Sequence, residues 1–386
     1  MARTRCSPPP KRRPPPAFTS FFEAVPDPRR VQANVVHPLL TVIAVVFVGM
    51  LCGAEGWDEI VLFAEGKQAW LASWLDLRNG VPSADTLRRV FQRLDPKAFG
   101  EGMRGWMLSI AGALKNQVVA IDGKTLRGVG QRADVPLHMV HVWAVGARVL
   151  LASAATEGAP SEPEVTRQLL DLLQLEGAII TLDANGCCRE SMAKIRERGG
   201  EWVCALKGNR GALLDAVQRC FEEIEAAGEL DERTRQWAEG DSAHGREEAR
   251  HVYVIKAEDA ELGDEALPGL RSIVMIQRAR LAAGNLSVER QYYVSSLPPQ
   301  ARKIAKVIRE HWGVENGLHW ILDVQMGEDA CAVHDRVAAE NLALVRRAAL
   351  SILKRDTSVK HGVKLKSSRA SCDNRYIEHL LWAEIP

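Results

Sequence analysis

The sequence predicts an α/β fold with a mixed or parallel sheet, which follows a helical N-terminal region. Three short apolar stretches are typical of buried strands: residues 118–121, 178–182 and 202–206. Apolar residues at helical spacing separate them, over 165–175 and again over 191–198, and strands that alternate with helices indicate this class. The chain of 386 residues is long enough for two or three domains.

The overall composition is that of an ordinary globular protein, and it excludes the extreme charge classes. Lysine and arginine total 50, aspartate and glutamate total 49, and the formal net charge is +1. Neither a histone-like basic protein nor an acidic tail has this balance, although a neutral sum can hide a local basic patch. The eight cysteines form no C-x-x-C pair and no zinc-finger spacing. We therefore expect free thiols in a reducing cytoplasm.

The first 17 residues are Pro-rich and basic, and we expect them to form a disordered arm. Such an arm is either a solvated tail or a segment that grips DNA. It lacks the apolar centre of a signal peptide. The longest apolar run, residues 39–54, has 16 residues, fewer than the ~20 that cross a bilayer. It therefore predicts a buried helix and no membrane span.

Residues 18–112 are predicted to form a helical N-terminal domain. An Asn-Gly-Val-Pro turn signal at 79–82 interrupts the helical pattern. Ser83 follows it directly, and a serine hydroxyl there suits the N-cap of a helix over 84–94. Asp85 in the first turn of that helix complements the helix dipole.

The α/β core is predicted in two parts, residues 113–209 and 299–355. Residues 210–298 lie between them as an insertion that is helical first and β-rich afterwards. Within the insertion, residues 211–270 carry sixteen acidic and six basic side chains, so this stretch is not expected to be the main phosphate-binding surface. Residues 356–386 form a basic C-terminal segment.

Two aspartates follow buried strands of the predicted core. Asp122 ends the apolar run in VVAIDGKT, and Asp183 ends the run in IITLDANG. Strand ends are where α/β folds place their sites. A single aspartate after a strand is usually a turn residue, whereas two on strands that could be neighbours favour a shared site.

A third acidic group comes from the stretch REHWGVENGLHW at 309–320. Four polar side chains there are spaced by four residues and would share one face of a helix: His311, Glu315, His319 and Asp323. Trp312 and Trp320 would pack beside that face. The glycines at 313 and 317 each cost a helix ~1 kcal/mol relative to alanine, which indicates a close approach to the backbone. The alternative is a solvated face with two packed tryptophans.

Three carboxylates of this kind suit a divalent-cation site for phosphodiester chemistry. Mg²⁺ prefers oxygen ligands and keeps several waters. Two such ions ~3.5–4 Å apart can clamp the attacking and leaving oxygens of an in-line displacement. Lys124 or Lys207 could hold a neighbouring phosphate, although each is also an ordinary surface charge.

Other catalytic motifs do not fit. Gly123-Lys124-Thr125 resembles the end of a P-loop, but the glycine that the motif needs five residues earlier is replaced by Val118. No H-E-x-x-H zinc motif and no G-x-S-x-G or Rossmann glycine pattern is present.

Several motifs together resemble the ISAs-type insertion-sequence transposases, a group of DDE transposases that includes the H-repeat-associated proteins. The motifs are VVAIDGKTLRG, ITLDANG, WVCALKGNR, HGREEAR, RQYYVSSL and HWGVENGLHWILDVQMGEDA. Before them, DPRR, HPLL, LCGAEGWDEI and NGVPSADTLRRVFQRLDP are similar to the associated N-terminal domain of that family. ENLALVRRAALSILK and SSRASCDNRYIEHLL extend the resemblance to about residue 382.

The resemblance implies a ribonuclease-H-like, or retroviral-integrase-like, core that a β-rich insertion interrupts. It implies Asp122, Asp183 and Glu315 as the catalytic and metal-binding triad, with Glu310 as a less favoured substitute for the third member. The implied cofactor is Mg²⁺, with Mn²⁺ as a substitute. The implied activity is cutting the ends of an element and joining them to target DNA in the bacterial cytoplasm.

DNA is accordingly the expected partner, as terminal inverted repeats and as target, with a homodimer in the synaptic complex. Nine basic and two acidic residues make the stretch 341–376 the most basic window after the N-terminal arm. We expect DNA contacts from this set of side chains: Lys124, Lys207, His311, Asn316, His319, Arg346 and Arg347.

Two other functions stay open because the chain departs from the family pattern. Ser161-Glu162-Pro163-Glu164 stands where the group has Lys-Ser-Asn-Glu, and Cys188 replaces a glutamine. One alternative is a catalytically impaired DNA-binding protein derived from a transposase. The other is a metal-dependent nuclease that uses the same core on different DNA.

Overall fold

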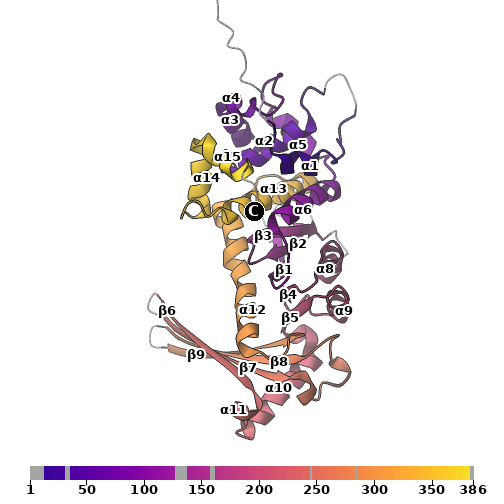
Figure 1. The fold of residues 1–386 in the computed structure, drawn as a ribbon, viewed down its shortest axis with the longest axis vertical. Coiled ribbons are helices and arrows are strands. Elements are labelled where there is room, and N and C mark those ends of the chain that lie inside the picture. The colour runs from indigo at the N-terminus through magenta and orange to yellow at the C-terminus, as the bar shows by residue number, and fades with distance from the viewer. Residues whose placement is uncertain are drawn as a thin grey trace, which may run out of the picture.

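The computed structural model describes residues 13–30, 35–126, 137–156, 161–243, 246–282 and 285–382. Its elements lie along one long axis, with the N-terminal helices at one end and the insertion at the other (Figure 1). Between them lies the predicted core, and the described strands of core and insertion form one nine-stranded mixed sheet. The α/β class is confirmed, and the first twelve residues of the predicted arm lie outside the described ranges.

Six helices form the N-terminal part: α1 Pro16–Phe22, α2 Leu39–Leu51, α3 Trp57–Gly66, α4 Gln68–Leu71, α5 Ala84–Phe91 and α6 Pro96–Ala111. Helix α2 is the predicted buried helix, and every one of its residues except Leu40 is buried. The Ser83 hydroxyl accepts the Thr86 N–H at 3.3 Å, which confirms the predicted N-cap. Helix α1 starts inside the predicted arm, with Pro16 at its first position, where proline is favoured. None of the described helices is long and apolar enough to cross a membrane.

Two glycines of α6 give a matched test of helix packing. A Cβ on Gly102 would lie 2.6 Å from the Phe21 carbonyl oxygen of α1, whereas a Cβ on Gly100 would meet only Leu344 Cδ1, at 3.8 Å. We expect Gly102→Ala to destabilise the fold by about 1–3 kcal/mol through overpacking. Gly100→Ala should stabilise it by about 0.5–1 kcal/mol, because alanine favours a helix. Urea unfolding measures both changes, and equal effects would contradict the close α1–α6 contact.

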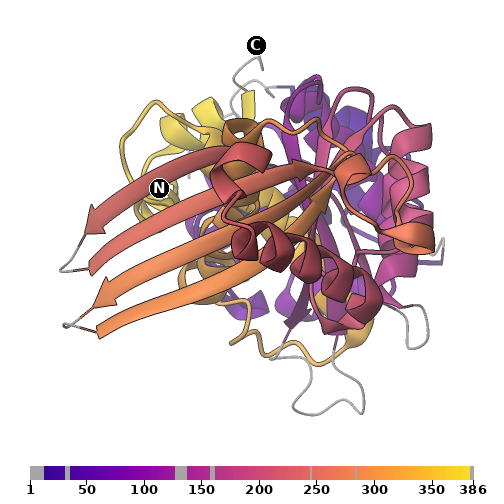
Figure 2. The same cartoon turned by 90° about the horizontal axis from the view of Figure 1, so that it is seen from below.

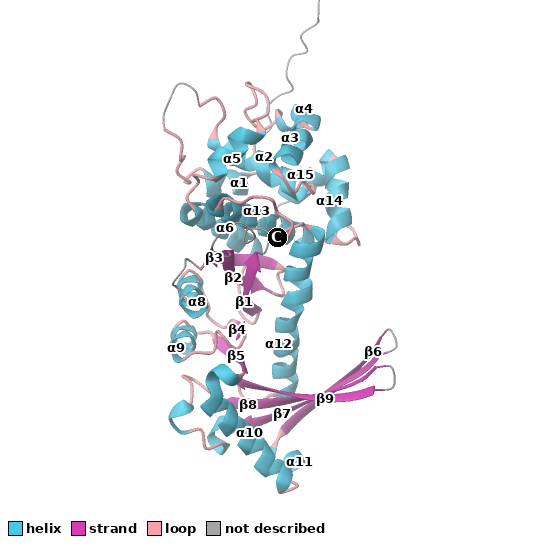
Figure 3. Cartoon of the chain, turned by 180° about the vertical axis from the view of Figure 1, so that it is seen from behind, coloured by secondary structure: helices cyan, strands magenta, loops and turns pink. Residues whose placement is uncertain are grey.

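The core sheet is built from five strands: β1 Val118–Leu126, β2 Leu137–Ala144, β3 Val149–Ala155, β4 Ile179–Leu182 and β5 Glu201–Leu206. Their order is β3-β2-β1-β4-β5, in which β2 alone runs antiparallel to its neighbours. Helices α8 Glu162–Asp171 and α9 Arg189–Glu197 cover one face. Helix α12, Ala301–Val314, crosses the other face (Figures 1 and 3). The strands predicted at 118–121, 178–182 and 202–206 are confirmed within one or two residues, except that β1 continues to Leu126.

The insertion starts with α10 Gly211–Ala226 and α11 Leu230–Arg233 and continues as four antiparallel strands: β6 Arg235–Ala243, β7 Arg246–Lys256, β8 Ser272–Ala282 and β9 Asn285–Ser295. Strand β9 pairs with β5, so the insertion extends the core sheet instead of forming a separate one. Its long strands project beyond the body of the molecule (Figure 2). Strand β6 was not expected from the sequence, because Trp237 is its only large apolar residue.

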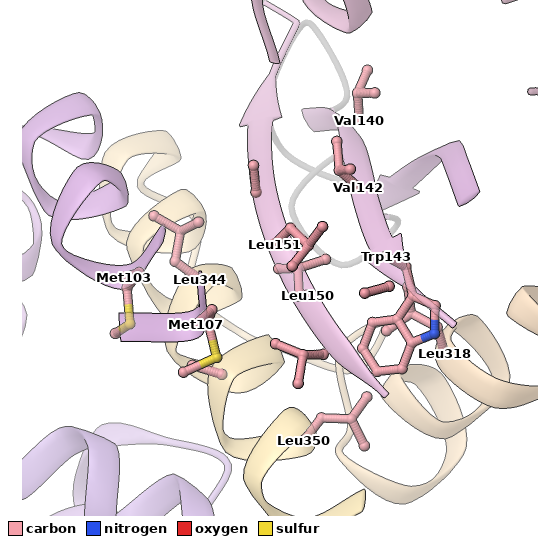
Figure 4. Packing of buried hydrophobic residues seen from close by; sticks show 14 of the residues in the cluster. Met103, Met107, Val140, Val142, Trp143, Leu150, Leu151, Leu318, Leu344 and Leu350 are labelled. Atoms are coloured by element: carbon pink, nitrogen blue, oxygen red, sulfur yellow. The ribbon is translucent and has the colours of Figure 1, made fainter. Parts of the chain in front are cut away.

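After α12 the chain forms two π-helical turns, Glu315–His319 and Ile321–Gln325, and then α13 Arg336–Arg355, α14 Val363–Cys372 and α15 Asn374–Trp382. Helix α13 lies between the sheet and the N-terminal helices. Leu344 and Leu350 of α13 pack in one cluster with Met103 and Met107 of α6 and Leu150 of β3 (Figure 4). This cluster joins the N-terminal helices to the core.

The C-terminal helices dock on the N-terminal ones. Lys67 Nζ donates to Asn374 Oδ1 at 2.7 Å, and Trp70 Nε1 donates to a Glu378 carboxylate oxygen at 3.0 Å. The Ser367 hydroxyl donates to the Leu51 carbonyl at 2.7 Å. These contacts hold the C-terminal helices against the N-terminal ones, while Lys360, Lys364, Arg369 and Arg375 of the basic segment remain exposed.

Candidate active site

The two aspartates that follow apolar runs lie side by side. Strands β1 and β4 are parallel neighbours, and Ile121 pairs with Leu182. Asp122 and Asp183 are the next residues on each strand, so the register places them at adjacent positions. The prediction that the two strands are neighbours is thus confirmed. The Gly123 N–H donates to Asp122 Oδ1 at 3.0 Å, and the Gly186 N–H donates to Asp183 Oδ1 at 3.1 Å.

The site is rich in negative charge, and neighbouring carboxylates raise one another's pKa there. Burial raises the pKa of Asp122 to about 7, and the neighbouring charge of Asp183 contributes next. The charges of Glu162 and Glu315 raise the pKa of Asp122 further. Burial also raises the pKa of Asp183, helped by the charge of Glu162, while the Gly186 N–H and Lys207 oppose this. Carboxylates that raise one another's pKa in this way favour a bound cation.

The segment that carries the third acidic group contacts both of the strands that position the aspartates. His311 Nδ1 lies within hydrogen-bond distance of Thr181 Oγ1 on β4, at 2.9 Å. His319 Nδ1 lies 3.6 Å from Asp122 Oδ2 on β1. Asp323 Oδ1 forms an ion pair with Lys124 Nζ on β1 at 2.5 Å. The polar face predicted for this segment is therefore turned toward the site, although π-helical turns replace part of the expected α-helix.

Glu315 starts the first π-helical turn, and its side chain is exposed. Its charge acts on Asp122, but more weakly than that of Asp183 or Glu162. Lys354 Nζ donates to the Gly317 carbonyl within this turn, and a Cβ on Gly317 would lie 3.3 Å from the same nitrogen. Turns with i→i+5 bonds inside α-helices frequently mark functional sites. The Asn316 side chain lies outside the described structure.

Sequence reasoning missed Glu162 as a member of the site. It begins α8, and its carboxylate lies 3.4 Å from His138 Nε2 on β2. A Cβ on Gly123 would lie 2.6 Å from His138 Nε2 and 2.8 Å from Glu162 Oε1, so a larger residue there would displace these two side chains. The sequence showed Glu162 as a departure from the family pattern. Only the folded chain, which places the start of α8 beside β1, shows where that carboxylate lies.

Three of the side chains expected to bind DNA are interior, and that prediction is corrected. Arg346 and Arg347 are 1% and 0% exposed, and Arg347 forms an ion pair with Glu328 at 2.5 Å. Lys124 is also buried and lies 3.6 Å from the same glutamate. Because a fully buried charge is costly unless it is paired, the basic run on α13 stabilises the interior beneath the site.

The other expected contacts stay near the site. Lys207 is exposed at the end of β5, and its charge lowers the pKa of Asp183. Burial lowers the pKa of both His311 and His319 to about 4, so both are neutral at pH 7 in the chain without DNA. Trp312 and Trp320 are 41% and 50% exposed, so the packing of these two tryptophans that both interpretations of the segment expected is only partial.

The donor set suits a hard divalent cation. Oxygen ligands from carboxylates are the type that Mg²⁺ and Mn²⁺ prefer, and the four acidic groups at the site are Asp122, Glu162, Asp183 and Glu315. Among the described residues, no group of three or more His, Cys, Asp or Glu is already gathered as a metal site. Asp122 and Asp183 stand at adjacent positions of the β1–β4 register. The seven described cysteines are free thiols, and Cys204 Sγ donates to the Asp183 carbonyl at 3.1 Å.

Comparisons with known proteins cover nearly the whole chain. The family described as "Transposase DDE domain" matches residues 113–352, and the family described as "DDE_Tnp_1-associated" matches residues 19–107. Escherichia coli O157:H7 has a relative named "Putative transposase YncI", 31% identical over 95% of this chain and 94% of its own. Escherichia coli K12 has "H repeat-associated putative transposase YhhI", 33% identical over 92% of this chain and 95% of its own.

A more distant likeness is found among solved structures. A piggyBac transposase in a synaptic complex with hairpin DNA has a TM-score of 0.40 at 12% identity, over 94% of this chain and 81% of that chain. The family match covers residues 113–352, and the relatives align along nearly the whole chain. The protein therefore belongs to the DDE transposase family of the H-repeat-associated proteins.

Proposed function

We propose that this transposase cuts DNA at the ends of its own element and joins those ends to target DNA, with Asp122, Asp183 and Glu315 as catalytic groups. The observation that carries the proposal is the register of β1 and β4, which sets the first two carboxylates side by side. Their raised pKa values support it, because a cation-free site of this kind is strained by like charge. The sheet order β3-β2-β1-β4-β5 supports a ribonuclease-H-like core.

In this proposal the chain holds the cation and the DNA by separate groups. Asp122 and Asp183 hold divalent cations, and Glu315 completes the set from the π-helical segment. Bound there, Mg²⁺ or Mn²⁺ supplies charge stabilisation for phosphoryl transfer and lowers the pKa of the attacking water or hydroxyl. The His311–Thr181 contact ties α12 to β4 and keeps Glu315 beside the strands. Lys207 lies where it can bind a phosphate next to the cleaved one.

A complete reaction needs two element ends, and one chain carries one acidic site. We therefore propose a homodimer that holds terminal inverted repeats and target DNA together. Both chemical steps are phosphoryl transfers, so positioning by the protein supplies much of the catalysis. Glu162 stands beside both aspartates and adds to the charge that a cation would neutralise.

An excision assay tests the proposal. The protein is expressed with a reporter plasmid that carries the natural DNA flanking its gene on both sides. We expect excision with the native protein and none with Asp183→Asn, because the variant loses one of two adjacent carboxylates. Asp215→Asn, an exposed change on α10, is the matched control and should excise normally.

Two results would favour the alternatives. Binding of the flanking DNA with no excision by the native protein indicates an impaired, DNA-binding descendant of a transposase, for which the exposed position of Glu315 is the supporting observation. Cutting of unrelated DNA without joining indicates a nuclease that uses the same core.

A further inference from the structure

A basic groove lies between the first turns of α12 and strand β6, away from the acidic site. It encloses about 860 Å³. Its charged and aromatic lining, called here the α12–β6 groove, is Arg235, Trp237, Arg302, Lys303, Lys306 and Arg309. Five basic side chains face a single acidic one, Glu239. Such a concentration of positive charge is typical of a surface that binds a polyanion.

The side chains of the α12–β6 groove are arranged to present charge to a ligand. Arg302 stacks over the Trp237 ring, with its guanidinium carbon 5.0 Å from the ring centre, an arrangement that fixes a planar donor in place. Arg309 lies 3.0 Å from Glu239. Lys303 and Lys306 are exposed, and Lys306 Nζ is 3.7 Å from Glu310. Exposed pairs of that length are weak, so phosphate can compete for this lysine.

The α12–β6 groove and the acidic site share one helix. Arg302, Lys303 and Lys306 lie 13, 12 and 9 residues before Glu315 on the α12 segment. At ~1.5 Å of rise per residue these are separations of about 14–20 Å along the helix axis. A DNA strand spaces its phosphates by ~3.4 Å along the duplex axis, so a strand that ran parallel to α12 would place about four to six phosphates between the groove and Glu315.

We propose that the α12–β6 groove binds the phosphate backbone of the DNA duplex on which the acidic site acts. The identity of the ligand, DNA, rests on the proposed function. The binding surface is inferred from the charge and the position of the groove. The sequence alone argued against the insertion because residues 211–270 carry a net charge of −10. The fold changes this, since it places Arg235 of the insertion beside the basic turns of α12 and leaves most acidic side chains elsewhere.

The test measures DNA binding without catalysis. A duplex of about 30 base pairs and arbitrary sequence is titrated in EDTA at several salt concentrations, because each phosphate contact contributes ~0.9 to the slope of log K against log salt. We expect Lys303→Gln/Lys306→Gln to weaken binding roughly tenfold near 0.1 M salt and to reduce that slope by about 2. The matched control is Lys115→Gln/Lys256→Gln, two exposed lysines outside the groove, which should leave the slope unchanged.

Each outcome has a definite meaning. An unchanged slope in the groove variant, with an unchanged thermal midpoint, overturns the proposal. Equal competition by polyglutamate and by DNA of the same charge also overturns it, because the groove then takes acidic polypeptide. The excision assay is scored separately. A reduced salt slope in the groove variant, with no excision by the native protein, supports the groove and contradicts the proposed function. Excision by the native protein, with an unchanged salt slope in the groove variant, supports the proposed function and contradicts the groove.

Discussion

Asp122→Asn is expected to abolish DNA cutting and, at the same time, to make the cation-free protein more stable at pH 7. The variant removes one of two adjacent carboxylates. Metal ions bound there would stabilise the transition state by several kcal/mol, so the rate of cutting should fall at least roughly a thousandfold. The gain in stability comes from the same source. The pKa of Asp122 is about 7, against an ordinary value of 3.8, so the ionised form is disfavoured in the folded chain.

The pH dependence follows from the direction of that shift. Between about pH 4 and pH 7 the folded protein holds a proton on Asp122 that the unfolded chain has lost, so the free energy of unfolding falls as pH rises through this window. A shift of this size corresponds to about 4 kcal/mol as an upper limit. Asp122→Asn lacks this term. Its advantage over the native protein should therefore be small at pH 4 and largest above pH 7.

Thermal unfolding in EDTA at several pH values measures the effect. Added Mg²⁺ or Mn²⁺ should raise the midpoint of the native protein and leave that of Asp122→Asn nearly unchanged, because ligands stabilise only the state that binds them. Asp215→Asn serves as the control. A variant that is less stable than the native protein at pH 7.5 in EDTA would show that Asp122 is a structural residue and not part of a strained cation site.

Glu328→Ala should be the most destabilising single change at the base of the site. Glu328 is fully buried, and its carboxylate faces Arg347, Arg346 and Lys124. Burial alone would raise the pKa of Glu328, but these three cations outweigh burial and lower it. Removal of one member of such a cluster leaves buried charge without a partner and costs about 3–5 kcal/mol.

The cluster already lacks spare acceptors. The Nε and Nη2 atoms of Arg346 and the Nε atom of Arg347 have no hydrogen-bond partner among the described residues. Urea unfolding should show the loss for Glu328→Ala, and Glu328→Leu/Arg347→Met should recover part of it, because the double variant removes opposite charges together. A loss below about 1 kcal/mol in the single variant would mean that water reaches this cluster.

The elements predicted best from the sequence are those whose sequence pattern depends only on nearby residues. Buried strands appear as short apolar runs whatever surrounds them, so β4 and β5 were found within one or two residues. The Ser83 cap was found for the same reason, since its partner is three residues away. The DDE resemblance added the three acidic positions, and the structure sets two of them side by side.

The parts that sequence reasoning missed depend on distant partners. Arg346 and Arg347 looked like a solvated basic face, because nothing local shows that Glu328 meets them inside the protein. Glu162 looked like a departure from a motif, because its place beside Gly123 depends on how α8 packs on the sheet. Strand β6 has almost no apolar alternation, and its pairing with β7 is what makes it a strand.

The position of α13 determines when the N-terminal helices can fold during synthesis of the chain. The N-terminal helices, including the largely apolar α2, pack against residues 336–355 and then against the docked final helices. Until that last portion has been synthesised, α2 has no complete set of neighbours, and exposed apolar helices promote aggregation. A polypeptide that ends early would therefore lack a folded N-terminal half as well as its own missing end.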